Sequence, residues 1–232
     1  MKQTTCIELR NISKAYSENT RESPAVKNVT ASFRRGEFTA IIGKSGSGKS
    51  TLLNILSGID RPTDGEVLYG ETRLRDMSEN ELARWRGENI GIVFQFFQLI
   101  PTLTVLENVL LPMDFCNIIP AARRREKANS LLERTGVTQY ANNLPSTISG
   151  GEQQRVAIAR SLANAPAFII ADEPTGNLDT GNAESIIGLF REMVSEGKGV
   201  IIVTHNNEIA ADADRVLHIS NGELVSDTRV VD

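Results

Sequence analysis

The sequence contains few aromatic residues, few cysteines and no excess of positive charge. Its 232 residues include one tryptophan, three tyrosines and two cysteines, and the formal net charge is −4. Nucleic-acid-binding proteins are more often basic, so we expect no nucleic-acid partner. Cys6 and Cys116 have no partner at metal-ligand spacing, and we expect both to be reduced rather than part of a disulfide or a metal site.

Long apolar runs are also lacking. No segment approaches the ~20 apolar residues that a membrane-spanning helix needs. Residues 1–6 show no apolar core of a signal peptide, so we expect a cytoplasmic chain. The hydrophobic content of 40% and the charged content of 23% are ordinary for a globular protein. The length allows one or two domains with a substantial core.

The most informative stretch is Gly43-Lys44-Ser45-Gly46-Ser47-Gly48-Lys49-Ser50, which matches the P-loop (Walker A) pattern G-x-x-x-x-G-K-[ST]. Apolar residues 38–42 before it and residues 51–56 after it predict a strand, a loop and a helix. Such a loop directs successive backbone N–H groups at one anion, and glycines allow the close approach. The residues predicted to bind nucleotide are Gly43, Ser45, Gly46, Ser47, Gly48, Lys49, Ser50 and Thr51. Lys49 would reach the β- and γ-phosphates, and the Ser50 hydroxyl would be a ligand of Mg²⁺.

Polar residues follow three further apolar stretches of the chain. Gln95 follows one of them, Asp172 and Glu173 follow the second, and His205 follows the third. Uniformly apolar strands that alternate with helices indicate a parallel sheet covered on both faces. In such sheets ligands bind at the carboxyl ends of the strands. We therefore expect these polar side chains to converge on the P-loop.

Each of these side chains has a predicted function. Asp172 has the position of a Walker B aspartate, which helps to hold Mg²⁺. Glu173 can act as the general base that polarises the attacking water. His205 can donate to the γ-phosphate and Gln95 can reach the metal or the water, although from local sequence alone both could equally cap strands or contact helices. Tyr16 could likewise stack on a purine base or pack as a surface tyrosine.

The pattern changes after Gln95 from strands to helices. An amphipathic helix is predicted over residues 120–136, and another from Ser149 onward. We interpret residues 96–163 as a helical subdomain that is inserted into an α/β core formed by residues 1–95 and 164–232.

The stretch Ile148-Ser149-Gly150-Gly151-Glu152 is a second candidate anion-binding site, because a Ser-Gly-Gly leads into a helix N-terminus. With this motif the chain resembles the ATP-binding subunits of ABC transporters, whose signature is usually Leu-Ser-Gly-Gly-Gln. Ile148 and Glu152 depart from that signature, whereas the phosphate-contacting Ser-Gly-Gly is intact. The resemblance covers nearly the whole chain, with the motifs in the same order.

The resemblance implies an α/β P-loop NTPase fold with a parallel sheet, an N-terminal antiparallel β-subdomain and a helical insertion. Tyr16 falls at the adenine-stacking aromatic position, Gln95 in the Q-loop, Asp179 in the D-loop and His205 at the switch histidine. The implied activity is ATP hydrolysis with Mg²⁺, in which Glu173, His205, Gln95 and Lys49 are the catalytic residues.

The resemblance also implies partners. Two copies would close head to tail on two ATP molecules, with Ser149, Gly150 and Gly151 of one copy at the γ-phosphate site of the other. An integral membrane permease would hold the ATPase on the inner face of the cell membrane. We expect at least one of Phe96, Phe97, Leu99 and Leu103 to line a groove for a permease helix.

A narrower resemblance rests on residues 94–101 and 106–112, which are similar to the group that serves macrolide exporters, lipoprotein-releasing machines and antimicrobial-peptide resistance permeases. It favours export or extraction of a peptide, drug or lipid-linked substrate. The alternatives are an importer or cell-division ATPase of the same shape, and an ABC ATPase that acts on nucleic acid or ribosomes without a membrane. ATPases of that last class usually carry two nucleotide-binding domains or long coiled-coil insertions, and the sequence shows neither.

Overall fold

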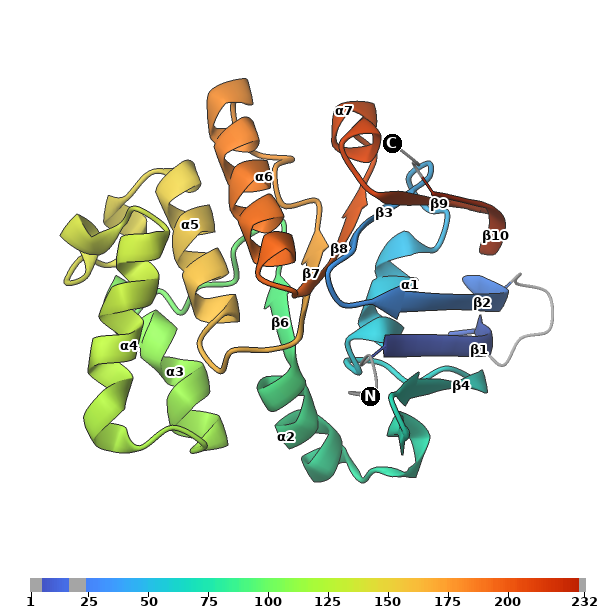
Figure 1. The fold of residues 1–232 in the computed structure, drawn as a ribbon, viewed down its shortest axis with the longest axis horizontal. Coiled ribbons are helices and arrows are strands. Elements are labelled where there is room, and N and C mark those ends of the chain that lie inside the picture. The colour runs from blue at the N-terminus through green and yellow to red at the C-terminus, as the bar shows by residue number, and fades with distance from the viewer. Residues whose placement is uncertain (1–5, 17–23, 230–232) are drawn as a thin grey trace.

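Two β-sheets and the helices around them make up the part of the chain that the computed structural model describes, residues 6–16 and 24–229. Figure 1 shows the helices α3, α4 and α5 at the left, the strands β1, β2, β4, β9 and β10 at the right, and β6 and β7 between them. Residues 1–5, most of the stretch assessed for a signal peptide, lie outside the described part. None of the helices described here combines the length and the apolar character needed to cross a membrane.

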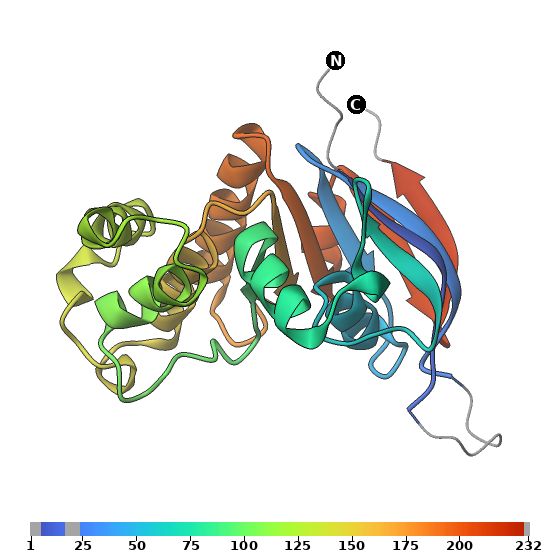
Figure 2. The same cartoon turned by 90° about the horizontal axis from the view of Figure 1, so that it is seen from below.

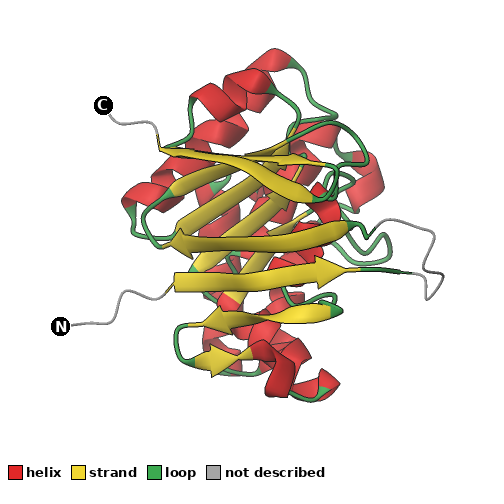
Figure 3. Ribbon diagram, turned by 90° about the vertical axis from the view of Figure 1, so that its right-hand side faces the viewer, coloured by secondary structure: helices red, strands yellow, loops and turns green. Residues whose placement is uncertain are grey.

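The smaller sheet is antiparallel and has the strand order β2-β1-β4-β5. Its strands are β1 (Cys6–Lys14), β2 (Val26–Arg34), β4 (Asp64–Tyr69) and β5 (Thr72–Arg73). Apolar residues alternate along β1, so that Ile7, Leu9 and Ile12 are buried on one face. In Figure 3 the strands are seen as broad arrows that run across the view. The predicted N-terminal antiparallel β-subdomain is confirmed.

The larger sheet has the order β10-β9-β3-β8-β7-β6. Its strands are β3 (Phe38–Ile42), β6 (Ile90–Val93), β7 (Phe168–Asp172), β8 (Gly199–Thr204), β9 (Arg215–Ser220) and β10 (Glu223–Arg229). All neighbours pair in parallel except β10, which is antiparallel to β9. Ile42 lies opposite Thr204 and Asp172 lies opposite Val203, so the strands end at one edge. The parallel sheet expected from the apolar runs is confirmed.

Helices cover both faces of this larger sheet (Figure 2). They are α1 (Lys49–Leu56), α2 (Glu79–Asn89), α3 (Val105–Cys116), α4 (Ala121–Arg134), α5 (Gly150–Ser161), α6 (Thr180–Ser195) and α7 (Asn207–Ala211). One hydrophobic cluster joins α1, α2 and the antiparallel sheet to one face. A second cluster joins α3, α4, α5 and α6 to the other face. The helices within residues 96–163 therefore share their core with the sheet.

A buried asparagine fixes the irregular segment between β6 and α3. Asn108 is fully buried in α3. Its Nδ2 donates to the carbonyl oxygens of Ile100, Leu103 and Thr104 at 3.1, 3.1 and 3.0 Å, and its Oδ1 accepts from the Ile100 N–H at 2.8 Å. One side chain thus provides hydrogen-bond partners for the backbone of a segment that has no neighbouring strand to pair with.

Replacement of Asn108 by leucine should lower the free energy of unfolding by about 3 kcal/mol, because buried backbone groups lose their partners. Urea denaturation followed by circular dichroism measures this change. The matched control is Asn80→Leu on the exposed part of α2, which should change stability by less than about 0.5 kcal/mol. Equal stability of the two variants would contradict the assigned function of Asn108.

Candidate functional site

The P-loop, residues 43–50, connects β3 to α1 in close contact with neighbouring backbone. A Cβ atom at Gly43 would lie 2.2 Å from the carbonyl oxygen of Ile219, and one at Gly48 would lie 2.2 Å from that of Ala25. Gly48 also has a φ of +100°, in the left-handed region that favours glycine. Close packing at both ends therefore requires glycine and fixes the path of the loop.

Lys49 is the first residue of α1, and its side chain folds back over the loop. Its Nζ donates to the carbonyl oxygens of Gly43 and Lys44 at 2.8 and 3.0 Å. The ammonium group is thereby held at the mouth of the loop although it is largely buried. A fixed cation beside a turn of backbone N–H groups and the positive end of a helix is suited to bind phosphate.

A cavity of about 580 Å³ lies at the carboxyl edge of the larger sheet, next to the P-loop. Its lining includes Gln95, Asp172, Glu173 and His205, which follow or end three different strands. The rest of the lining is Ala25, Ser45, Gly46, Gly48, Lys49, Ser50, Thr51 and Val203. The structure therefore brings the predicted strand-end residues together with most of the P-loop. Gly43 and Ser47 belong to the loop but are not part of this lining.

The donor set in the cavity fits Mg²⁺ bound together with a nucleotide. Burial raises the pKa of the Asp172 carboxyl, and a hydrogen bond with Ser50 opposes that shift. Ser50, Asp172 and Gln95 all offer the oxygen ligands that Mg²⁺ prefers. Across residues 6–16 and 24–229, no group of three or more His, Cys, Asp and Glu could hold a metal ion. Mg²⁺ usually takes one or two carboxylates plus phosphate oxygens, so a single carboxylate suffices here.

Glu173 is held by hydrogen bonds to both of its carboxylate oxygens. Oε1 lies 2.7 Å from Nδ1 of His205, and Oε2 accepts from the Thr204 hydroxyl at 3.0 Å. The Glu173 backbone has a φ of +44° and its N–H donates to Val203. The sequence indicated Glu173 and His205 but not Thr204, because a threonine at the end of an apolar strand forms no recognisable motif.

The Ser-Gly-Gly stretch begins α5 and lies outside this cavity. Ser149 caps α5: its hydroxyl lies 2.8 Å from Oε2 of Glu152, whose carboxylate also accepts from the Ser149 N–H at 2.7 Å. Hydrogen bonds from Tyr140 and then Ser149 hold the pKa of Glu152 below its usual range. Glu152, the departure from the usual signature, thus completes a capping box. Gly150 and Gly151 follow in the first turn, and Figure 1 shows α5 and α1 on opposite sides of β6 and β7.

Two other predicted nucleotide-binding residues also lie outside the cavity lining. The Tyr16 side chain is 65% exposed, and its hydroxyl lies 3.4 Å from Oγ1 of Thr51, which does line the cavity. Asp179 caps α6, where its Oδ1 accepts from the Asn182 N–H at 3.0 Å. Tyr16 therefore lies next to the cavity, whereas Asp179 lies outside the cavity lining and is held in place as the N-cap of α6.

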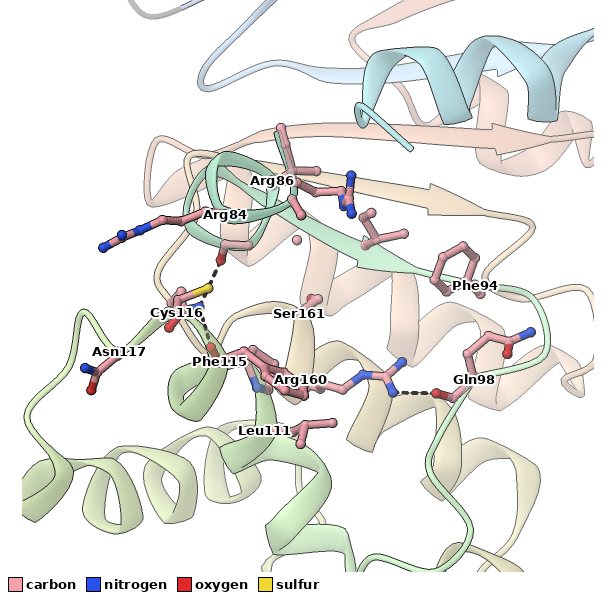
Figure 4. Close-up of a pocket in the computed structure, with 17 residues that line it drawn as sticks. Arg84, Arg86, Phe94, Gln98, Leu111, Phe115, Cys116, Asn117, Arg160 and Ser161 are labelled. Atoms are coloured by element: carbon pink, nitrogen blue, oxygen red, sulfur yellow. Dashed lines mark hydrogen bonds between the residues drawn. The ribbon is translucent and has the colours of Figure 1, made fainter. Parts of the chain in front are cut away.

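A second cavity, of about 770 Å³, lies between α2, β6, α3 and α5 (Figure 4). We call it the Q-loop groove, because Phe94 and Gln98 on either side of the Q-loop residue line it. Its charged lining residues are all arginines, namely Arg84, Arg86 and Arg160. Apolar lining residues include Leu111, Pro112 and Phe115.

Phe96, Phe97, Leu99 and Leu103, of which at least one was expected to line a groove for a permease helix, do not line this cavity. Leu99 packs against the core cluster, and Phe96 is 69% exposed.

A left-handed turn follows the Q-loop residue. Phe97 and Gln98 have φ values of +56° and +50°. The guanidinium of Arg160 donates to both of their carbonyl oxygens, at 2.7 and 2.5 Å. Arg160 thus holds this left-handed turn beside the groove, which Phe94 and Gln98 line.

The family model for ABC transporters matches residues 26–176. This chain belongs to the ABC transporter family. It is 47% identical to the uncharacterised ABC transporter ATP-binding protein YvrO of Bacillus subtilis, over 96% of this chain and 97% of YvrO. It is 45% identical to the pyoverdine export ATP-binding/permease protein PvdT of Pseudomonas fluorescens, over 99% of this chain but only 35% of PvdT.

Solved cassettes agree with this family membership. The dimeric, post-hydrolysis structure of the ATP-binding cassette MJ0796 with ADP and Pi superposes with a TM-score of 0.90, at 40% identity, over 97% of this chain and 99% of that one. The predicted fold class is confirmed, and this chain is an ATP-binding ABC ATPase.

Proposed function

We propose that this ATPase acts as a head-to-tail homodimer that closes on two Mg-ATP and drives a membrane permease. One observation carries the dimer: the Ser149-Gly150-Gly151 stretch does not line the cavity that holds Lys49 of the same chain. A second copy can supply it, and the similar MJ0796 cassettes are dimeric structures. Binding of ATP would close the dimer and hydrolysis would reopen it.

The chain's own residues suit phosphoryl transfer to water. Lys49 and His205 stabilise negative charge on the γ-phosphate. Glu173 Oε1 takes a proton from the water as its oxygen bonds to the γ-phosphorus, while the bond to the bridging oxygen breaks and ADP leaves. Ser50, Asp172 and Gln95 would hold Mg²⁺, which would supply charge neutralisation.

Two further residues act at the edge of this site. Tyr16 stacks on the adenine, because its exposed ring lies beside the start of α1. Asp179 lies in the turn before α6. In the closed dimer it lies next to the nucleotide that is bound between the two copies. Residues 96–163 act as the helical subdomain that carries Ser149, and residues 1–95 and 164–232 as the core that carries the P-loop.

The direction of transport that we propose is export. PvdT is named as a pyoverdine export ATP-binding/permease protein, and this chain spans only 35% of it. We infer a separate or fused integral membrane permease that holds the ATPase on the inner face of the membrane.

The Q-loop groove is the site that we assign to the permease. Its apolar lining suits a helix laid into a groove. Its three charged lining residues are cationic, so the helix should carry at least one carboxylate. Burial lowers the pKa of Arg160, whose guanidinium hydrogen-bonds only backbone carbonyls among the interactions described. A carboxylate on the permease helix would offset that burial.

Replacement of Glu173 by glutamine should retain ATP binding and lower turnover by ~10²–10⁴-fold, since the variant lacks the general base. It should also accumulate an ATP-bound dimer, which gel filtration with ATP detects. Glu192→Gln, at an exposed position of α6, is the control and should hydrolyse ATP normally. Near-normal turnover of Glu173→Gln would remove Glu173 from this function.

The shared site is tested by mixing two inactive variants, Ser149→Arg and Lys49→Ala. Each homodimer has two damaged sites, whereas a mixed dimer has one doubly damaged site and one intact site. The mixture should therefore regain ATP hydrolysis that neither variant shows alone. Ser149→Arg should still bind ATP as a monomer through Lys49. Loss of ATP binding by that monomer would show that the head-to-tail arrangement is wrong.

The groove assignment is tested with Phe115→Asp, at a lining residue that is 79% exposed. The variant should fold and hydrolyse ATP as the purified chain but should lose binding to its co-expressed permease, since a carboxylate would face the permease carboxylate. Ile118→Asp is the matched control, because Ile118 is 45% exposed and does not line the groove. Normal permease binding by Phe115→Asp would place the docking surface elsewhere.

A further inference from the structure

Thr204 is a fully buried residue that none of the recognised motifs includes. It is the last residue of β8 and directly precedes His205. Its hydroxyl makes two hydrogen bonds: it accepts from the Asn206 N–H at 3.0 Å, and it lies 3.0 Å from Oε2 of Glu173.

These two bonds fix the direction of the hydroxyl proton. A threonine hydroxyl has one proton to donate. The Asn206 N–H occupies one of the lone pairs of the hydroxyl oxygen, and an ionised carboxylate can only accept. The proton of Thr204 therefore points at Glu173, and a chain of bonds runs from the Asn206 backbone through Thr204 to Oε2.

The two oxygens of Glu173 consequently differ. Oε2 is held by a buried hydroxyl, whereas Oε1 faces His205, whose side chain is 71% exposed. We propose that Thr204 is a positioning residue for ATP hydrolysis, which anchors Oε2 so that Oε1 is presented to the attacking water. The proposal rests on the proposed function of Glu173 as the general base.

The hydrogen bond from Thr204 matters because the other partner of the Glu173 carboxylate, His205, restrains it only weakly. Glu173 has a left-handed backbone conformation, and a glutamate side chain has several staggered rotamers available. His205 lies in a solvent-exposed turn and is itself expected to bind the γ-phosphate. A bond from a buried strand residue keeps the carboxylate in place whichever group His205 contacts. Positioning of this kind contributes to rate rather than to substrate affinity.

The same chain of bonds connects the base to α7. Asn206, whose N–H starts the chain, also caps α7 through its Oδ1, which accepts from the Glu208 N–H at 2.8 Å. Two independent links therefore join the Glu173 carboxylate to the turn that carries His205. One runs through the His205 side chain and the other through Thr204.

The test compares Thr204→Val, which removes the hydroxyl and keeps the shape, with Thr204→Ser, which keeps the hydroxyl. For the purified chain with Mg-ATP, Thr204→Val should lower kcat by ~10–100-fold with KM for ATP unchanged, because a small misplacement of a catalytic group costs rate. Thr204→Ser should restore kcat close to that of the unmodified chain. Thr39→Val, at a buried threonine of β3, is the control and should leave kcat unchanged.

The double variant Glu173→Gln/Thr204→Val shows whether Thr204 acts through Glu173. If it does, the double variant should be no slower than Glu173→Gln alone. A further loss equal to that of the single Thr204→Val variant would overturn the proposal, as would normal kcat in a folded Thr204→Val variant. If Glu173→Gln itself hydrolyses ATP normally, the proposed function of Glu173 fails, which is a separate result.

If circular dichroism shows that Thr204→Val does not fold, Thr204→Ala is compared with Thr204→Ser instead. Both are smaller than threonine, and only serine has the hydroxyl. Slow hydrolysis by the alanine variant and fast hydrolysis by the serine variant support the proposal. Equally slow hydrolysis by both would overturn it.

Discussion

The in-register parallel pairing of β3, β7 and β8 is the constraint on which the site depends. Ile42 lies opposite Thr204, and Asp172 opposite Val203, so the three strands end at one level. A slip of one residue would turn each terminal side chain to the other face of the sheet. The P-loop, the carboxylates and Thr204-His205 are therefore placed by the hydrogen-bond ladder of a buried sheet rather than by flexible loops.

Much of this arrangement could be predicted from the sequence, because the signals are local. The P-loop lies within eight consecutive residues, and Asp172 directly ends an apolar run. The parallel sheet follows from strands that are apolar on both faces. For Gln95 and His205 the sequence left open whether they belong to the site or cap strands and contact helices, and the structure places both in the cavity beside the P-loop.

Features that depend on distant contacts could not be predicted in this way. The sequence of the segment after Gln95 does not reveal its left-handed turn, which Arg160, more than 60 positions away, holds through two backbone carbonyls. Thr204 was missed because its importance lies in which atom of Glu173 it contacts. The capping box of Ser149 and Glu152 is by contrast a local pattern that the sequence does carry, although the comparison with the family signature treated Glu152 only as a substitution.

The α5 helix has a different contact at each end. Ser149 caps its start and Arg160, near its end, holds the turn beside the Q-loop groove. The two residues are about 16 Å apart along the helix axis, from a rise of 1.5 Å per residue. Insertion or deletion of one residue between them would rotate one end by about 100° relative to the other. The length of α5 is therefore constrained from both ends.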